Sequence, residues 1–128
     1  MAAPTQLTDL KWHKKSKRLS LDFSNGKKFD LPLEYLRVFS PSAEVQGHGV
    51  GQEVLVHGKL FVNLKSIEPV GNYAIKLIFD DGHDSGLYTW RYLYELALNH
   101  PKNWKAYLAR LDKASQKREP KDVHILKL

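Results

Sequence analysis

The chain of 128 residues contains no cysteine, and this absence excludes several kinds of chemistry. Without thiols the chain itself cannot form a disulfide, attack a substrate with a thiolate, or hold zinc or an iron–sulfur cluster through sulfur. No apolar run approaches the roughly 20 residues that a membrane-spanning helix needs. The first residues also lack the basic and apolar regions of a secretory leader. We therefore expect a cytoplasmic protein that has no contact with a membrane.

The residues that are present provide enough apolar material for one folded domain. Hydrophobic residues make up 42% of the chain, and the length suits a single compact unit. The formal charge of +6 is unevenly spread, because residues 102–128 carry eight basic and three acidic residues, whereas residues 1–101 carry twelve and eleven. We expect a domain over residues 5–113, followed by a flexible basic C-terminal tail over residues 114–128.

Alternation of apolar and polar residues predicts several strands. Residues 19–23 alternate in this way, which is the period of a strand with one buried face. Strands are expected over residues 7–13, 18–23, 27–31, 60–67, 72–79 and 85–88. In the fifth of these, Tyr73 is expected to share one apolar face with Ile75, Leu77 and Phe79. The turn residues between these strands favour antiparallel pairing.

A helical period follows the last predicted strand. Apolar residues recur at three- and four-residue intervals after Thr89, which predicts a helix with Thr89 as its N-cap, and again after Pro101. Proline favours the first position of a helix, so Pro32 predicts the start of a short helix over residues 33–39. Residues 42–59 contain four glycines and predict a long irregular loop. The expected fold class is α+β, a single domain with a small, mostly antiparallel β-sheet packed against C-terminal helices.

Three segments together resemble a known family. They are LRVFSPSAEVQGHG at residues 36–49, IEPVGNYAI at residues 67–75 and DDGHDSGLYTW at residues 80–90. This combination is similar to the N-terminal domain of gamma-butyrobetaine hydroxylase and to small stand-alone proteins related to it, long classed as a domain of unknown function. The resemblance covers roughly residues 5–100 and does not extend to a catalytic oxygenase domain.

The resemblance also implies where a zinc site would lie in relatives. Three cysteines would correspond to Ser40, Ser42 and Val45, and a histidine would correspond to His83. Only the histidine is kept in this chain. A closed zinc site of this type needs thiolates, which serine hydroxyls do not replace. No cofactor is therefore expected, although zinc or iron at this place remains an alternative.

The resemblance implies a non-catalytic accessory module that binds another protein. Related domains occur beside oxygenases and iron–sulfur carrier proteins, so the expected partner is an oxygenase or an iron–sulfur assembly protein. The expected interaction surface surrounds the segment with Ser40 and Ser42 and the segment with His83. It comprises Ser40, Ser42, Glu44, His48, Asp81, His83 and Tyr92, of which Tyr92 falls off the apolar helical stripe and is a candidate for exposure.

Two other function classes stay open. A metal ion could be held by His83 together with His48, His57 or the nearby aspartates, because imidazole and carboxylate are ligands of divalent metals. A weak nucleic-acid binder could use the basic termini, although the chain shows no nucleic-acid recognition motif. An enzyme is the least favoured class. None of the six histidines begins a His-x-Asp or His-x-Glu iron-binding element, and Ser42 with Glu44 and His48 lacks the setting of a nucleophile elbow.

Overall fold

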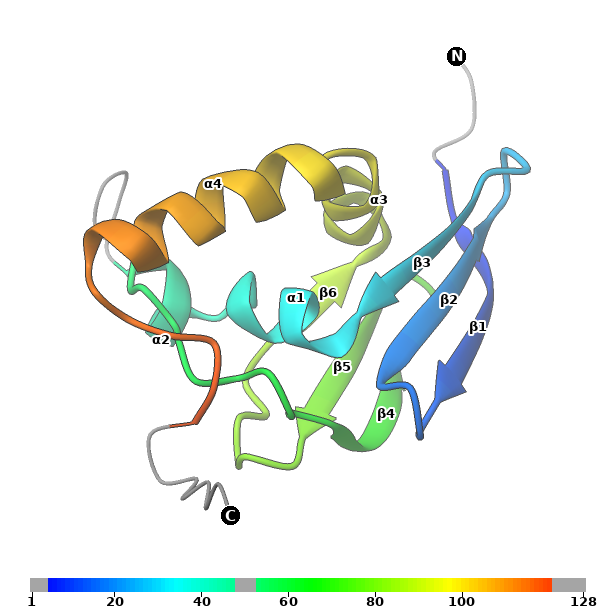
Figure 1. Cartoon of the computed structure of the whole chain (residues 1–128). Coiled ribbons are helices and arrows are strands. Elements are labelled where there is room, and N and C mark those ends of the chain that lie inside the picture. The colour runs from blue at the N-terminus through cyan, green and yellow to red at the C-terminus, as the bar shows by residue number, and fades with distance from the viewer. Residues whose placement is uncertain (1–4, 48–52, 121–128) are drawn as a thin grey trace.

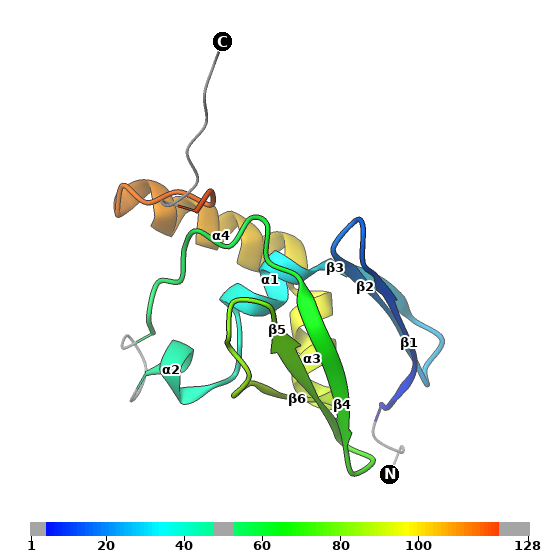
Figure 2. The same ribbon diagram turned by 90° about the horizontal axis from the view of Figure 1, so that it is seen from below.

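Two three-stranded sheets and two C-terminal helices make up most of the molecule (Figures 1 and 2). The structure is a computed structural model that describes residues 5–47 and 53–120. In chain order the elements are β1 (Leu7–His13), β2 (Arg18–Phe23), β3 (Lys28–Pro32), α1 (Leu33–Val38), α2 (Ala43–Gln46), β4 (Leu64–Val70), β5 (Ala74–Phe79), β6 (Leu87–Thr89), α3 (Trp90–Leu98) and α4 (His100–Lys113). The predicted α+β class is confirmed, and the predicted single sheet is in fact two sheets.

The first sheet has the antiparallel order β1-β2-β3. Its central strand buries Leu19, Leu21 and Phe23 on one face, as the alternation predicts. Leu19 pairs with Leu31 of β3, so two apolar side chains lie side by side on the buried face. The bounds of β1 and β2 agree with the prediction residue for residue.

The second sheet has the antiparallel order β4-β5-β6. Ile75, Leu77 and Phe79 are buried, as expected, but β5 begins only at Ala74. Tyr73 lies in the preceding turn and is 51% exposed, so its predicted place on the buried face is wrong. The strand β4 also begins later than predicted, at Leu64, and the two residues before it form hydrogen bonds with Asp80 and other turn groups instead.

The helices begin where local chemistry favours them. Thr89 is the N-cap of α3, and its hydroxyl oxygen accepts a hydrogen bond from the backbone N–H of Tyr92, as predicted. Pro32 precedes α1 as its N-cap and does not occupy the first helical position, a difference of one residue. Residues 43–46 of the loop predicted to be irregular form the single-turn helix α2. Four residues are too few to give a helical period in the sequence.

Buried tyrosines connect α1 to the rest of the core. The Tyr35 hydroxyl donates to the Leu96 carbonyl at 2.7 Å, and the Tyr88 hydroxyl donates to the Leu36 carbonyl at 2.6 Å. Tyr107 of α4 donates in the same way to the Val56 carbonyl. Burying a phenol requires such a partner for its hydroxyl. The first two bonds attach α1 to α3 and to β6, and α1 lies beneath the C-terminal helices in Figure 1.

The segment after α4 returns along the body of the molecule. Lys117 and Arg118 accept hydrogen bonds through their carbonyl oxygens, from Gly58 and Leu60 respectively. The division into a domain ending at residue 113 and a tail stays a prediction, but these contacts attach residues 117 and 118 to the domain. Within residues 5–47 and 53–120, no helix is long and apolar enough to cross a membrane.

Candidate functional site

Ser40, Ser42 and His83, far apart in the sequence, meet at one buried point. Nε2 of His83 lies 2.8 Å from the Ser40 hydroxyl oxygen and 3.4 Å from that of Ser42. The two serines belong to the connection between α1 and α2, and His83 belongs to the turn between β5 and β6. All three side chains are almost completely shielded from solvent. The sequence therefore identified three residues that the fold brings into contact.

The turn that carries His83 is built to direct its ring inward. The Asp81 carboxylate accepts a hydrogen bond from the backbone N–H of His83, and the His83 carbonyl accepts one from Phe79. Gly82 has a φ of 90°, a backbone conformation that side chains disfavour, so glycine suits the tight part of the turn. This Asp-Gly-His order places the imidazole against the serines.

Glu44 approaches the other ring nitrogen of His83. Its carboxylate oxygen lies 3.4 Å from Nδ1, while the Glu44 side chain itself is 73% exposed. Burial lowers the pKa of His83 and the charge of Arg37 lowers it further, against the opposite effects of Glu44 and Asp81. The imidazole is therefore neutral at pH 7. If Nδ1 donates to Glu44, Nε2 accepts a hydrogen bond from the Ser40 hydroxyl.

Asp81 forms the charged part of the site. Its Oδ2 atom lies 2.8 Å from Nε of Arg37 and 2.7 Å from Nζ of Lys59. Burial by itself raises the pKa of this carboxyl, but the hydrogen bonds from Lys59, the His83 backbone and Arg37 outweigh burial and lower the pKa to about 2. Asp81 therefore joins α1, the β5–β6 turn and the loop before β4 through one ionised group.

The remaining residues of the predicted interaction surface differ in their exposure to solvent. Glu44 is exposed, whereas Tyr92 is half-buried and donates its hydroxyl to the carbonyl oxygen of Phe39. The expectation that Tyr92 is exposed is therefore wrong, because the carbonyl of Phe39, which follows α1, lies against this side of α3. His48 lies outside the described residues.

The residues at the predicted metal position do not form a zinc site of the family type. Ser40 and Ser42 present hydroxyls that are hydrogen-bonded to His83, and Val45 has no donor atom. Across residues 5–47 and 53–120, no group of three His, Cys, Asp or Glu side chains is arranged to hold a metal ion. Closed zinc sites need four strong ligands. Zinc bound as the resemblance implies does not fit this chain.

Ser40, His83 and Glu44 place a hydroxyl, an imidazole and a carboxylate side by side, as in a hydrolytic triad. A substrate, however, has no room at the Ser40 hydroxyl. The Ser40 oxygen is fully buried and accepts a further hydrogen bond from the Ser42 backbone. A Cβ atom added at Gly86 would lie only 2.6 Å from this oxygen, so backbone packs directly against it. A nucleophile must reach the substrate carbonyl along an open path. The arrangement is instead a hydrogen-bonded cluster that joins two loops.

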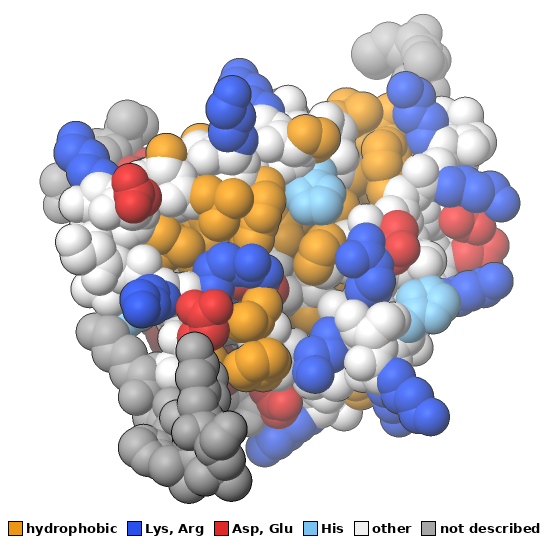
Figure 3. Space-filling model, viewed as in Figure 1, with side chains coloured by type: hydrophobic (Ala, Val, Ile, Leu, Met, Phe, Trp, Pro, Cys, Tyr) orange, Lys and Arg blue, Asp and Glu red, His pale blue; other side chains and the backbone are white. Residues whose placement is uncertain are grey.

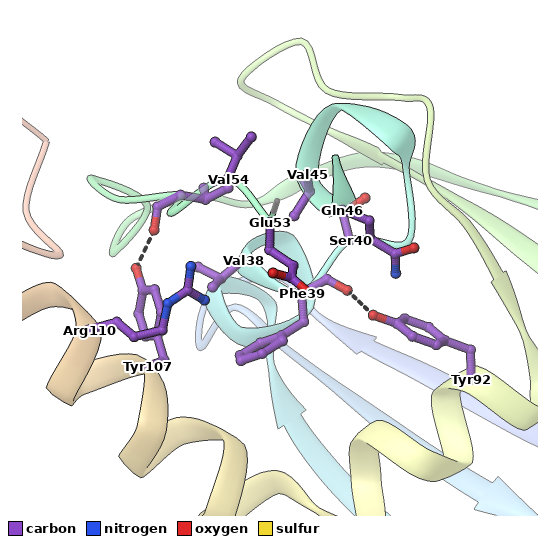
Figure 4. Close-up of a pocket in the computed structure, with 11 residues that line it drawn as sticks. Val38, Phe39, Ser40, Val45, Gln46, Glu53, Val54, Tyr92, Tyr107 and Arg110 are labelled. Atoms are coloured by element: carbon purple, nitrogen blue, oxygen red, sulfur yellow. Dashed lines mark hydrogen bonds between the residues drawn. The ribbon is translucent and has the colours of Figure 1, made fainter. Parts of the chain in front are cut away.

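A small cavity adjoins this cluster (Figure 4). It has a volume of about 120 Å³ and Ser40 is part of its wall. Most of its lining is apolar and comes from Val38, Phe39, Val45, Val54, Val56 and Tyr107. Gln46, Glu53, Tyr92 and Arg110 supply the polar groups. Of these lining residues the sequence indicates only Ser40, Val45 and Tyr92, because no local pattern shows that α4 contacts the loop after α2.

Comparison with known proteins places the chain in a family. Residues 10–94 match the family described as "Gamma-butyrobetaine hydroxylase-like, N-terminal". A comparison with curated proteins finds none that is significantly similar to this chain. The similarities that remain are with solved structures.

Two protein structures determined by NMR in solution are similar over nearly their whole length. One is 53% identical, with 96% of each chain covered and a TM-score of 0.78. The other is 52% identical, with 98% of this chain and 93% of the other covered and a TM-score of 0.79. A crystal structure of a protein of unknown function from Acidithiobacillus ferrooxidans, assigned to the DUF971 family, is 32% identical over 72% of this chain and 92% of its own, with a TM-score of 0.56. The chain therefore belongs to the gamma-butyrobetaine hydroxylase-like N-terminal domain family.

Proposed function

We propose that the protein is a non-catalytic accessory module that binds a partner protein through the cavity beside Ser40. The observation that carries this proposal is the size of the cavity, about 120 Å³. Sites for cofactors and drug-sized ligands usually measure about 300–1,000 Å³, whereas a cavity of about 150 Å³ holds benzene. The space therefore suits a single apolar side chain, as an anchor residue of a protein partner would supply.

The surroundings of the cavity support a protein interface. Val54 on its wall is 51% exposed, although it is apolar. Glu53 and Arg110 are exposed charged residues of the same wall. Glu44, beside His83, is exposed nearby. An apolar centre with a charged rim is the usual composition of a specific protein interface.

The class of partner is proposed from the family. The family is described by its likeness to the N-terminal part of a hydroxylase, so the domain has a counterpart that accompanies an oxygenase. We expect the partner of this chain to be an oxygenase or an iron–sulfur assembly protein. Because the described residues offer no thiolate, the chain would assist such a protein by contact and not by carrying a metal cluster.

A pull-down from the native host with two matched variants tests the proposal. Val54→Asp places a charge on the cavity wall, and Leu98→Asp places the same charge on α3, where Leu98 is similarly exposed at 47%. A partner that uses the cavity should be retained by the wild type and by Leu98→Asp and lost by Val54→Asp. Equal retention by all three would show that the cavity is not the binding site.

Metal binding through His83 and nucleic-acid binding through the basic residues stay predictions. Metal analysis of tag-free wild type and His83→Ala tests the first. For the second, two basic residues of the first sheet lie beside acidic ones, since Arg18 of β2 pairs with Asp30 and Lys28 of β3 approaches Asp22. A salt titration with a generic duplex and a single strand tests it, because electrostatic binding weakens steeply with added salt.

A further inference from the structure

The irregular chain that follows α4 lies against an earlier loop. The backbone N–H of Gly58 donates to the Lys117 carbonyl at 2.9 Å, and that of Leu60 donates to the Arg118 carbonyl at 3.0 Å. A Cβ atom added at Gly58 would lie 3.5 Å from the Cα atom of Pro120, so the chain passes close to this glycine. Figure 1 shows this return of the chain from the end of α4 toward the segment before β4. Residues 115–120 are called the C-terminal strap below.

One side chain of the strap, that of Arg118, contacts both a carboxylate and an aromatic ring. Arg118 donates from Nε and Nη2 to the two carboxylate oxygens of Glu34, at 2.9 and 2.7 Å. Its guanidinium carbon lies 5.3 Å from the centre of the Trp104 ring. Glu34 is only 5% exposed, although it is a carboxylate on the short helix α1. A buried carboxylate beside an aromatic face matches the planar, two-pronged shape of a guanidinium group.

The other side chains of the strap contribute little to its attachment. Ser115, Lys117 and Glu119 are exposed. Ser115 has a φ of 56°, a strained value for a residue with a side chain, at the point where the strap leaves α4. A segment that is held mainly by one ion pair and two backbone bonds can open locally without unfolding the core.

We propose that Glu34, Trp104 and the backbone of residues 58–60 form a recognition site for an arginine in a peptide, and that Arg118 of the same chain occupies it in the isolated molecule. The ligand is an arginine-containing segment of a partner protein, which displaces the strap. The site is separate from the cavity of the proposed function. Figure 3 shows apolar side chains at the surface of this face, with Lys and Arg side chains around them.

The contacts of Arg118 define what a ligand needs. The carboxylate selects a cation, and the paired Glu34 oxygens together with the Trp104 ring favour arginine over lysine, whose ammonium group cannot form two parallel bonds. The N–H groups of Gly58 and Leu60 bind two consecutive carbonyl oxygens of the strap and would bind those of a ligand backbone in the same way. The strap competes with any such ligand, because an attached segment has an effective concentration on the order of millimolar.

Binding of a peptide to the full-length Arg118→Ala variant tests the proposal. The probe is residues 116–120 with blocked ends, and the readout is the indole N–H signal of Trp104 in NMR spectra. The variant should bind the probe saturably and about tenfold or more tightly than the wild type, whose own strap fills the site. Because Arg118→Ala leaves a buried carboxylate without a cation, Arg118→Lys is a second variant that retains a charge.

Four controls distinguish this site from general charge attraction. Glu34→Gln in the Arg118→Ala background should abolish binding, and a probe with lysine in place of arginine should bind much more weakly. Arg91→Ala removes an arginine that is 90% exposed and should bind the probe no better than the wild type. Blocked arginine alone should bind more weakly than the peptide, because it lacks the backbone bonds. Absence of a saturable shift in both folded variants, or equal binding of the lysine probe or of blocked arginine, would overturn the proposal.

Discussion

At the scale of single residues, His83 lies in a buried site whose partners are hydroxyl groups. Its relatives would be expected to surround this histidine with cysteines, whereas here Ser40 and Ser42 give it hydroxyl partners. Each polar atom of the cluster has a partner, so burial leaves no large penalty. Hydrogen bonds therefore join the two loops that carry these residues.

Restoring the sulfur atoms should restore metal binding. The variant Ser40→Cys, Ser42→Cys, Val45→Cys is expected to purify with about one zinc ion per chain, because three thiolates and one imidazole complete a closed tetrahedral site. A chelator should lower the melting temperature of this variant and leave that of the wild type unchanged. Adding His83→Ala should weaken the zinc site strongly. If zinc binds equally well without His83, the cluster is not the equivalent position.

At the scale of elements, most helix and strand positions follow from local patterns in the sequence. The bounds of β1 and β2 and the cap of α3 are predicted because alternation and capping involve neighbouring residues. The division into two sheets is not predicted, because it depends on which distant strands pair. The same holds for α2, which is too short to show a period.

The cap of α3 should have a measurable share in stability. Thr89→Ala removes the oxygen that accepts the Tyr92 N–H, which should lower the free energy of unfolding by about 1 kcal/mol. Thr89→Ser keeps the oxygen and should lose much less. Urea unfolding of the three proteins provides the comparison. Equal losses in the two variants would assign the effect to the missing methyl group and not to the cap.

At the scale of the whole molecule, the functional features depend on contacts between distant segments. The serine–histidine cluster could be predicted because the family resemblance aligned its residues, and the structure confirms that Ser40, Ser42 and His83 are close together. The cavity and the pairing of Arg118 with Glu34 could not be predicted. Both require α4 and the segment after it to lie beside residues 53–60, which only the packing of the complete core determines.

Acid stability should reveal the contribution of Asp81 to this long-range packing. Its pKa falls from 3.8 to about 2 on folding, which corresponds to about 2 kcal/mol of stability. Because the folded pKa is the lower one, this stability is present above the unfolded value and is lost as the pH falls from about 4 through 2.

Comparison of Asp81→Asn with the wild type in urea at about pH 6 and about pH 3 measures this effect. The difference in the free energy of unfolding between the two proteins should shrink at the lower pH. Asp112→Asn, at an exposed position of α4, should show no such dependence. A difference that stays constant with pH would mean that the Asp81 charge does not act in this way.

The short helix α1 has a consequence for how the protein tolerates change. Glu34 binds the strap, Tyr35 and the Leu36 carbonyl bind the core, Arg37 binds Asp81 and Val38 lines the cavity. A deletion or insertion of one residue would rotate the positions that follow it by about 100° and break several of these contacts together. This helix should therefore tolerate only substitutions by side chains of similar shape. Insertions and deletions should be tolerated in other parts of the chain.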